Sequence, residues 1–310
     1  MRPQILLGTA EGVWGLSPDG SISPPALAGQ AVTALTGKGT RTWAIVKGHD
    51  IWTTQHDGRW EEALVVEGWS ATCLSPTASG LFIGTEGAHL LKFAGGRLEP
   101  VKSFESVEGR ETWYTPWGDP ADVRSISVDP SGVLFVNVHV GGVVRSGDDG
   151  HTWSPMLDIE VDVHQVRAHP VRPGFVLAAA AAGLGVSRDG GHSWDFVSSG
   201  LHARYLRAVA VSGETVLVAV STGPGGRRAA LYRRPVDGDA PFERCRGGLP
   251  EWFGDNVDTG CLDAESSTVV AGTTDGRVFT SLDGGVTWSL AAKGLPEVHC
   301  VLVRSGGQVS

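Results

Sequence analysis

The chain has 310 residues, with 44 glycines and 17 prolines, and 41% of it is hydrophobic. This density of turn-forming residues in a chain that is still so apolar indicates many short strands, not disorder. A formal net charge of −9 without a basic stripe argues against nucleic acid and anionic membranes as partners. Four cysteines without CxxC spacing, no membrane-length apolar run and no signal-peptide core predict a cytoplasmic protein with buried thiols.

The first predicted strand is residues 5–9, Ile-Leu-Leu-Gly-Thr. The same Gly-Thr ending recurs at 82–85 and 270–273, in the second strand of a repeating four-strand unit. The chain therefore begins inside a unit, after its innermost strand. Six later innermost strands follow in chain order, separated by turns at the spacing of an all-β fold. They begin near Ala31, Ser70, Arg124, His164, Arg207 and Asp258.

Three octapeptides with the pattern S-x-D-x-G-x-[ST]-W follow in these units, at 146–153, 187–194 and 281–288. Degenerate copies lie at 17–20 and 54–60. Glycine and aspartate tolerate the positive φ of a tight hairpin, and the aspartate carboxylate can accept N–H groups of its own turn. The tryptophan then returns to the core. We interpret the octapeptide as a structural hairpin and assign its aspartate no catalytic role.

The last predicted strand, residues 298–303, supplies the innermost strand that the first unit lacks. Closure by the chain's own two ends removes exposed sheet edges. The sequence thus predicts an all-β protein: a seven-bladed β-propeller with four-stranded antiparallel blades of about 44 residues each. The whole chain, 1–310, is predicted to be one domain.

The octapeptide resembles the Asp-box (BNR) repeat of sialidase-like, glycosyl-hydrolase-type β-propellers. In that family the Asp-box joins the third and fourth strands on the face away from the active site. The resemblance therefore implies that a site lies among the second-to-third and fourth-to-first strand loops. The Arg-Ile-Pro signature of sialidases is missing near the N-terminus, so the resemblance extends to the fold and not to sialidase activity.

Ionisable and aromatic residues gather on this predicted face. Arg124 and Arg207 suit a carboxylate or phosphate, because the guanidinium group offers a planar fork of donors. His164 or His139 is the candidate general base, and Asp258 or Asp119 would orient it or supply a proton. The predicted ligand-binding residues are Arg124, Arg207, His299, His202, Tyr205, Trp113, Trp117 and Trp252. This set predicts a funnel for a small anionic or carbohydrate-like ligand, with hydrolase or lyase chemistry if it is an enzyme.

Three alternatives stay open at this point. A divalent metal could bind His139, His164 and His89, because imidazole binds Zn, Cu, Ni or Fe. The charged residues could also be buried struts between blades, since buried charges are normally paired. Finally, the chain could be a non-catalytic protein-binding or assembly propeller that uses the Trp-rich face. A deep funnel of converging histidines and arginines would favour the enzyme, and aromatics spread over a broad face would favour the docking protein.

Overall fold

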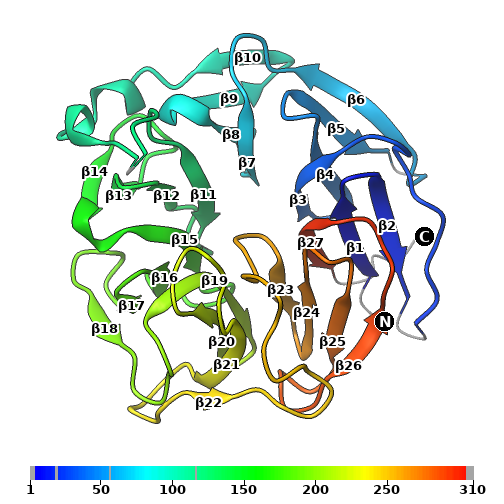
Figure 1. The fold of residues 1–310 in the computed structure, drawn as a ribbon. Helices are drawn as coiled ribbons and strands as arrows, with labels where there is room; N and C mark the ends of the chain where they lie inside the picture. Colours follow the sequence, from blue (N-terminus) through cyan, green and yellow to red (C-terminus); the bar gives the residue numbers. More distant parts are fainter. Residues whose placement is uncertain (1–3, 18–19, 56, 116, 305–310) are drawn as a thin grey trace. The chain divides into compact units, whose positions relative to one another are not determined.

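The structure is a computed structural model that describes residues 4–17, 20–55, 57–115 and 117–304. Its strands form the seven antiparallel sheets of a β-propeller, which confirms the predicted fold (Figure 1). The strands fall into two compact units. The central unit is Val66–Val197, and the terminal unit combines the chain up to Val65 with the chain from Ser198 onward. That the whole chain is one domain stays a prediction.

The central unit contains blades three, four and five, each with four strands in sequence order. Blade three is β7 (Ala71–Pro76), β8 (Leu81–Thr85), β9 (Leu90–Ala94) and β10 (Arg97–Pro100). Blade four is β11 (Val123–Val128), β12 (Leu134–Val138), β13 (Gly142–Ser146) and β14 (Ser154–Leu157). Blade five is β15 (Val163–Ala168), β16 (Val176–Ala180), β17 (Gly183–Ser187) and β18 (Asp195–Val197). Its loops carry the 3-10 turns η1 (Glu86–Ala88), η2 (Phe104–Ser106), η3 (Arg110–Thr112) and η4 (Ile159–Val161).

The terminal unit contains blades one, two, six and seven. Blade one is β1 (Gln4–Thr9), β2 (Gly12–Leu16) and β27 (Val298–Arg304), and blade two is β3 (Val32–Lys38), β4 (Arg41–Val46), β5 (Asp50–Thr54) and β6 (Trp60–Val65). Blade six is β19 (Tyr205–Ser212), β20 (Thr215–Ser221), β21 (Ala230–Pro235) and β22 (Glu243–Arg244). Blade seven is β23 (Leu262–Glu265), β24 (Thr268–Gly272), β25 (Val278–Ser281) and β26 (Ser289–Ala292).

Blade one is completed by the end of the chain, as predicted. β27 pairs antiparallel with β1, with Ile5 opposite Val303 and Leu7 opposite Val301 (Figure 1). This sheet has three strands within the described residues. Among the described residues beyond β2, isolated bridges join Leu16 to Ile22 and Val13 to Ala26, where the other blades have a fourth strand.

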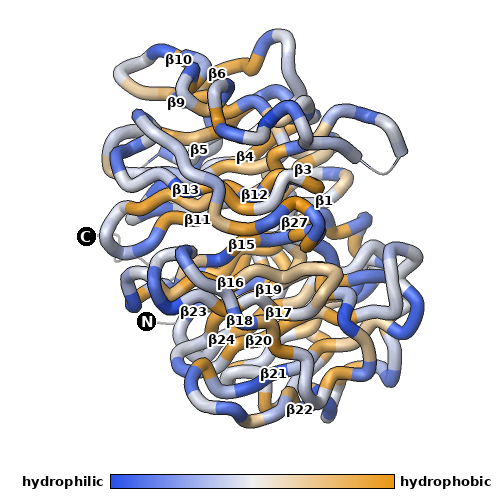
Figure 2. The backbone as a smooth tube through the Cα atoms, turned by 90° about the vertical axis from the view of Figure 1, so that its left-hand side faces the viewer, coloured by the Kyte–Doolittle hydropathy of each residue, from blue (hydrophilic) through white to orange (hydrophobic). Residues whose placement is uncertain are grey.

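The second strand of each blade supplies much of the core. β8, β12, β16 and β24 are buried along their whole length, and β16 consists only of valine, leucine and alanine. A strand covered on both faces is expected to be continuously apolar rather than alternating. Figure 2 shows the same distribution: hydrophobic colours follow the strands, and hydrophilic colours gather in the turns between them. The four cysteines are buried and free, as expected.

The repeated Gly-Thr ending has a packing reason. A Cβ on Gly84 would overlap Val123 Cγ1, on the first strand of the next blade, and would come 2.6 Å from Cys73 Sγ. In blade one, a Cβ on Gly8 would overlap Cys300 Sγ and approach Val32 Cγ1 to 3.0 Å. Glycine is therefore required at this position because the next blade's inner strand packs directly on the backbone.

The three octapeptides form the hairpins between the third and fourth strands of blades four, five and seven. In blade five the Asp189 carboxylate accepts the Ser193 hydroxyl (2.6 Å) and the Ser193 backbone N–H (2.9 Å). Ser187 Oγ accepts the Gly191 N–H at 2.8 Å. The degenerate copies include Pro18, Asp19 and His56, which lie outside the described residues.

Hydrogen bonds within these hairpins lower the pKa of Asp148, Asp189 and Asp283 to about 2, and the bond from the following Thr or Ser hydroxyl contributes most. Their carboxylates are therefore committed to the turns, as the sequence predicts. Throughout the described part of the chain, no helix is long and apolar enough to cross a membrane.

Candidate functional site

The predicted site residues are divided between the two units. His139, His164, Arg124, Asp119, Trp113, Trp117 and His89 belong to the central unit. Arg207, Asp258, His299, His202, Tyr205 and Trp252 belong to the terminal unit. Each unit brings part of its own set together, and the two clusters are described separately.

In the central unit, Asp162 contacts both candidate bases. Its Oδ1 lies 3.6 Å from His139 Nε2, and its Oδ2 lies 3.5 Å from His164 Nε2. His139 and His164 are only 3% and 0% exposed. The His164 imidazole, more than any other group, lowers the pKa of Asp162, and the charges of His139 and Arg124 act in the same direction. The structure thus joins the two predicted histidines through a carboxylate that the sequence did not single out.

The backbone around this cluster is held in an unusual conformation. Val140, directly after His139, has a φ of 43°, and Asp162 has a φ of 50°. Positive φ is uncommon for any residue with a side chain and most costly for a β-branched one. The turn after β12 and the entry to β15 therefore fix His139 and Asp162 in place, because the surrounding contacts must outweigh this local strain.

The predicted acid Asp119 does not join this cluster. Its side chain is exposed, and its backbone carbonyl accepts the Thr115 hydroxyl at 2.5 Å. The neighbouring Asp122 accepts the Gly87 N–H at 3.3 Å. Burial raises the pKa of Asp122, and the nearby carboxylates of Glu86 and Asp119 raise it further, while Arg124 opposes them. Arg124 thus acts on two aspartates of its own protein, Asp122 and Asp162.

The metal site predicted on His139, His164 and His89 is not found. His89 Nδ1 lies 2.8 Å from Glu105 Oε1, and Glu105 Oε2 lies 2.8 Å from Arg110 Nη2. Across the described ranges of the chain, no group of three or more His, Cys, Asp or Glu side chains is placed to hold a metal ion. His89 belongs instead to an ion-pair network that ties the turn after β8 to the insertion before β11.

This insertion, residues 101–122, displays aromatic side chains. Trp113 is half-buried, between Phe104 (ring centroids 5.7 Å apart) and the Arg110 guanidinium (5.0 Å). Trp117 lies against His139, with ring centroids 4.9 Å apart, but is 61% exposed. Tyr114 is 44% exposed, and Trp69, before β7, is 36% exposed beside His89. We call Trp69, Tyr114 and Trp117 the aromatic patch.

In the terminal unit, the predicted ligand clamp and the predicted acid bind each other. Arg207 Nε lies 2.5 Å from Asp258 Oδ1, and Tyr205 Oη lies 3.4 Å from Arg207 Nη1. Asp258 lies in the turn before blade seven, because β23 begins only at Leu262. His299, on β27, has its Nδ1 3.3 Å from the Val32 carbonyl oxygen. These residues have the contacts of struts between blades, the structural alternative weighed from the sequence.

His202 and Trp252 are brought together at the loops of blade six, with ring centroids 5.0 Å apart. His202 Nδ1 lies 2.8 Å from Tyr232 Oη, and the rings of His202 and Tyr232 are stacked. Arg228 and Arg244 also contact Trp252. The sequence suggested Trp252 and His202 but not the arginines that surround them, which lie on separate segments of the blade.

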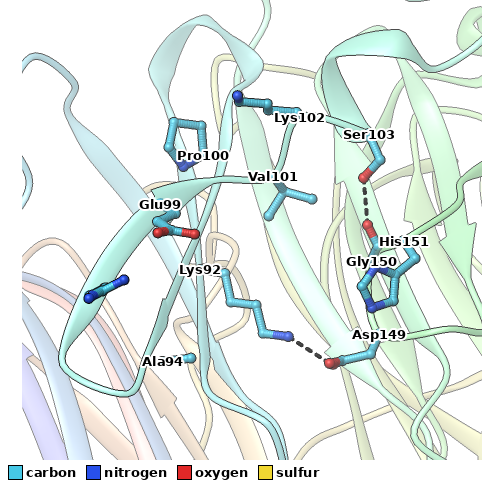
Figure 3. Close-up of a pocket in the computed structure, with 11 residues that line it drawn as sticks. Lys92, Ala94, Glu99, Pro100, Val101, Lys102, Ser103, Asp149, Gly150 and His151 are labelled. Carbon is cyan, nitrogen blue, oxygen red and sulfur yellow. Dashed lines mark hydrogen bonds and ion pairs between the residues drawn. The ribbon is translucent and has the colours of Figure 1, made fainter.

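A groove of about 900 Å³ in the central unit was not predicted at all (Figure 3). It runs between the β9–β10 hairpin and the octapeptide hairpin of blade four. Lys92 Nζ forms an ion pair with Asp149 Oδ2 at 2.6 Å, and Lys102, Ser103 and His151 also line the groove (Figure 3). One feature of the sequence does mark the hairpin that lines this groove. Asp149, with a φ of 60°, takes the place of a glycine in the other two octapeptides, Gly190 and Gly284.

No protein-family model matches the chain. A curated relative, ribosome biogenesis protein ERB1 of Chaetomium globosum, is 42% identical over 67 residues, which is 21% of this chain and 9% of that protein. The chain therefore matches less than a tenth of that relative's length.

Solved structures give the same fold at low identity. An ancestral GH74 enzyme is similar over 98% of this chain and 40% of its own, with a TM-score of 0.61 and 14% identity. The GH74 xyloglucanase from Xanthomonas campestris is similar over 84% of this chain and 45% of its own, with a TM-score of 0.56 and 17% identity. U3-55K is similar over 87% of this chain and 83% of its own, with a TM-score of 0.61 and 14% identity. Such identities establish the β-propeller fold and nothing finer.

Proposed function

We propose that this protein is a non-catalytic docking propeller that binds a partner protein through the aromatic patch. The observation that carries the proposal is the exposure of Trp69, Tyr114 and Trp117 on the loops that lead into β7 and β11. Large aromatic side chains dominate the energy of protein–protein interfaces, because they bury much area at little cost in conformational entropy. Here Trp69 lies against His89 and Trp117 lies against His139, and all three side chains remain exposed.

The patch rests on a rigid base. His139 supports Trp117, and His139 is itself held by Asp162 and by its backbone N–H, which donates to the Asp122 carbonyl at 2.8 Å. His89 supports Trp69 in the same way, and Glu105 and Arg110 hold His89. A preorganised anchor loses little freedom when a partner binds, so this arrangement favours affinity.

The hydrolase or lyase prediction has less support. Three of its four candidate base and acid residues are engaged with other side chains: His139 and His164 with Asp162, and Asp258 with Arg207. A general base must reach a substrate proton, and two histidines exposed by 3% and 0% are poorly placed for that.

Quantitative affinity capture tests the proposal. The immobilised full chain is compared with a Trp69→Ala/Tyr114→Ala/Trp117→Ala variant and with a control, Phe196→Ala/Val171→Ala, which removes exposed apolar side chains of the same unit outside the patch. A partner retained by the wild type and the control but lost from the triple variant supports docking at the patch. Equal retention by all three proteins contradicts it.

A further inference from the structure

A second cluster, in the terminal unit, is built around Trp252. Its neighbour Phe253 is buried against Phe279 (ring centroids 5.5 Å apart), and the Phe253 N–H donates to the Ala229 carbonyl at 2.9 Å. Asn256 Nδ2 donates to the Pro224 carbonyl at 3.1 Å. The loop before β23 is thus fastened to the loop before β21. Phe253 enters the core, whereas Trp252 is only half-buried and contacts His202.

Two guanidinium groups lie against the Trp252 ring. Arg244 Cζ is 3.9 Å and Arg228 Cζ is 4.6 Å from its centroid, distances at which the π face attracts a cation. His202 lies against the same ring at 5.0 Å, and its own Nδ1 is 2.8 Å from Tyr232 Oη. Four segments in and beside blade six therefore meet at this indole: the loops before β19, β21 and β23, and the edge strand β22.

The cluster is positively charged without internal compensation. Arg228, Arg244 and Arg246 all act electrostatically on the Tyr232 phenol, and within the described chain none of the three forms an ion pair with a carboxylate. Arg244 Nη2 is buried and lacks a hydrogen-bond partner among the described residues. Burial, and then the charges of Arg228 and Arg244, lower the pKa of His202. A chain of net charge −9 thus concentrates unpaired arginines at one place.

We infer that the Trp252 cluster, Arg228, Arg244, Arg246, His202 and Trp252, binds an acidic peptide segment of another protein. Guanidinium groups are suited to carboxylates, and a local positive patch would draw an acidic segment to a protein that otherwise repels it. The charges lie on two segments, 227–228 and 244–246, and both contact one indole. An acidic segment with apolar side chains between its carboxylates matches an indole that guanidinium groups flank.

This inference does not depend on the aromatic patch, which belongs to the other unit. The probe is a fluorescein-labelled peptide of alternating Glu and Leu, and its binding to the full chain is followed by fluorescence anisotropy. The variants are Arg228→Gln, Arg228→Gln/Arg244→Gln and Trp252→Ala. The control is Arg41→Gln, which removes the same charge from another exposed arginine beside an indole, that of Trp43 at 5.9 Å.

We expect saturable binding by the wild type that weakens several-fold when NaCl rises from about 50 to about 300 mM. The double variant and Trp252→Ala should bind about tenfold more weakly or worse, and Arg41→Gln should stay within about twofold of the wild type. Arg228 is exposed, so Arg228→Gln should fold like the wild type, and a thermal melt checks this. This single variant therefore reports on binding even where Arg244→Gln impairs folding.

Three outcomes would overturn the inference. The first is equal affinity of the Arg228→Gln variants and the wild type. The second is equal binding of a Gln-Leu peptide. The third is displacement of the peptide by inorganic phosphate at a concentration equal to that of the peptide, which would identify a simple anion site. The Trp69→Ala/Tyr114→Ala/Trp117→Ala variant should bind the peptide as the wild type does. A negative result for the aromatic patch can therefore be told apart from a negative result for the Trp252 cluster.

Discussion

Trp117 lies on the imidazole ring of His139, with ring centroids 4.9 Å apart, and still exposes 61% of its surface. His139 is only 3% exposed and in contact with Asp162. A residue predicted as a catalytic base therefore serves as the support of an exposed aromatic side chain. The contact links the buried ionisable cluster of the central unit to the surface that we propose for docking.

Asp162→Asn tests whether this cluster is structural. Asparagine tolerates the positive φ at this position, so the change removes the charge and keeps the backbone. We expect a loss of about 1–3 kcal/mol in the free energy of unfolding at pH 7, because two buried histidines lose their carboxylate partner. Urea denaturation measures it, with Glu160→Gln, an exposed charge two residues away, as the control.

The pH dependence of Asp162 follows from the direction of its pKa shift. The folded-state pKa is lowered, so the unfolded chain binds a proton more readily at acidic pH. The stabilisation is complete above the unfolded value near 3.9 and is lost as pH falls through the lower, folded value. Stability differences between wild type and Asp162→Asn should therefore shrink below about pH 4. A difference that is unchanged at pH 3 would contradict this account.

The octapeptide hairpins should be sensitive to acid for the same reason. Hydrogen bonds from Ser193 above all hold the pKa of Asp189 at about 2. The folded protein then binds this proton at a lower pH than the unfolded chain does. Stability therefore falls between about pH 4 and about pH 2. Asp189→Asn should make the fall in urea midpoint over this range shallower. Asp195→Asn, which changes an exposed aspartate of the same hairpin, is the matched control.

Gly84→Ala tests the packing between blades three and four. The new Cβ would overlap Val123 Cγ1 and press on Cys73, so we expect a loss of about 1–3 kcal/mol. A Cβ on Gly225 would meet no atom within 4 Å, and Gly225 has no positive φ, so Gly225→Ala should change stability by less than about 0.5 kcal/mol. Equal melting temperatures of the two variants would show that the inner strand does not pack on the Gly84 backbone.

Much of the fold was predictable because its signals are local. The octapeptides specify hairpins through bonds within eight residues, and the Gly-Thr ending marks where one strand packs on the next blade. The closure of blade one by 298–303 follows from a missing strand at one end and a spare strand at the other. Within the described residues, the segment after β2 pairs through isolated bridges, a local detail that no motif in the sequence marks.

The candidate site was less predictable because it depends on pairings across loops. Asp162 follows a short 3-10 turn and belongs to no motif, so nothing in the sequence marked it as the partner of His139 and His164. Arg207 and Asp258 were placed in one arc, but their sequence separation of 51 gave no sign that they bind each other. The arginines around Trp252 come from positions 228 and 244, and only the folding of blade six brings them to one ring.

Photocrosslinking at Trp117 in living cells tests the docking proposal most directly. A benzoylphenylalanine side chain replaces Trp117 in one sample and Phe196, the exposed control on β18, in another. The proposal predicts a discrete crosslinked complex of higher mass from position 117, absent from position 196 and weakened when Tyr114 is also changed to alanine. No adduct at position 117, or the same adducts from both positions, would contradict a partner protein at the aromatic patch.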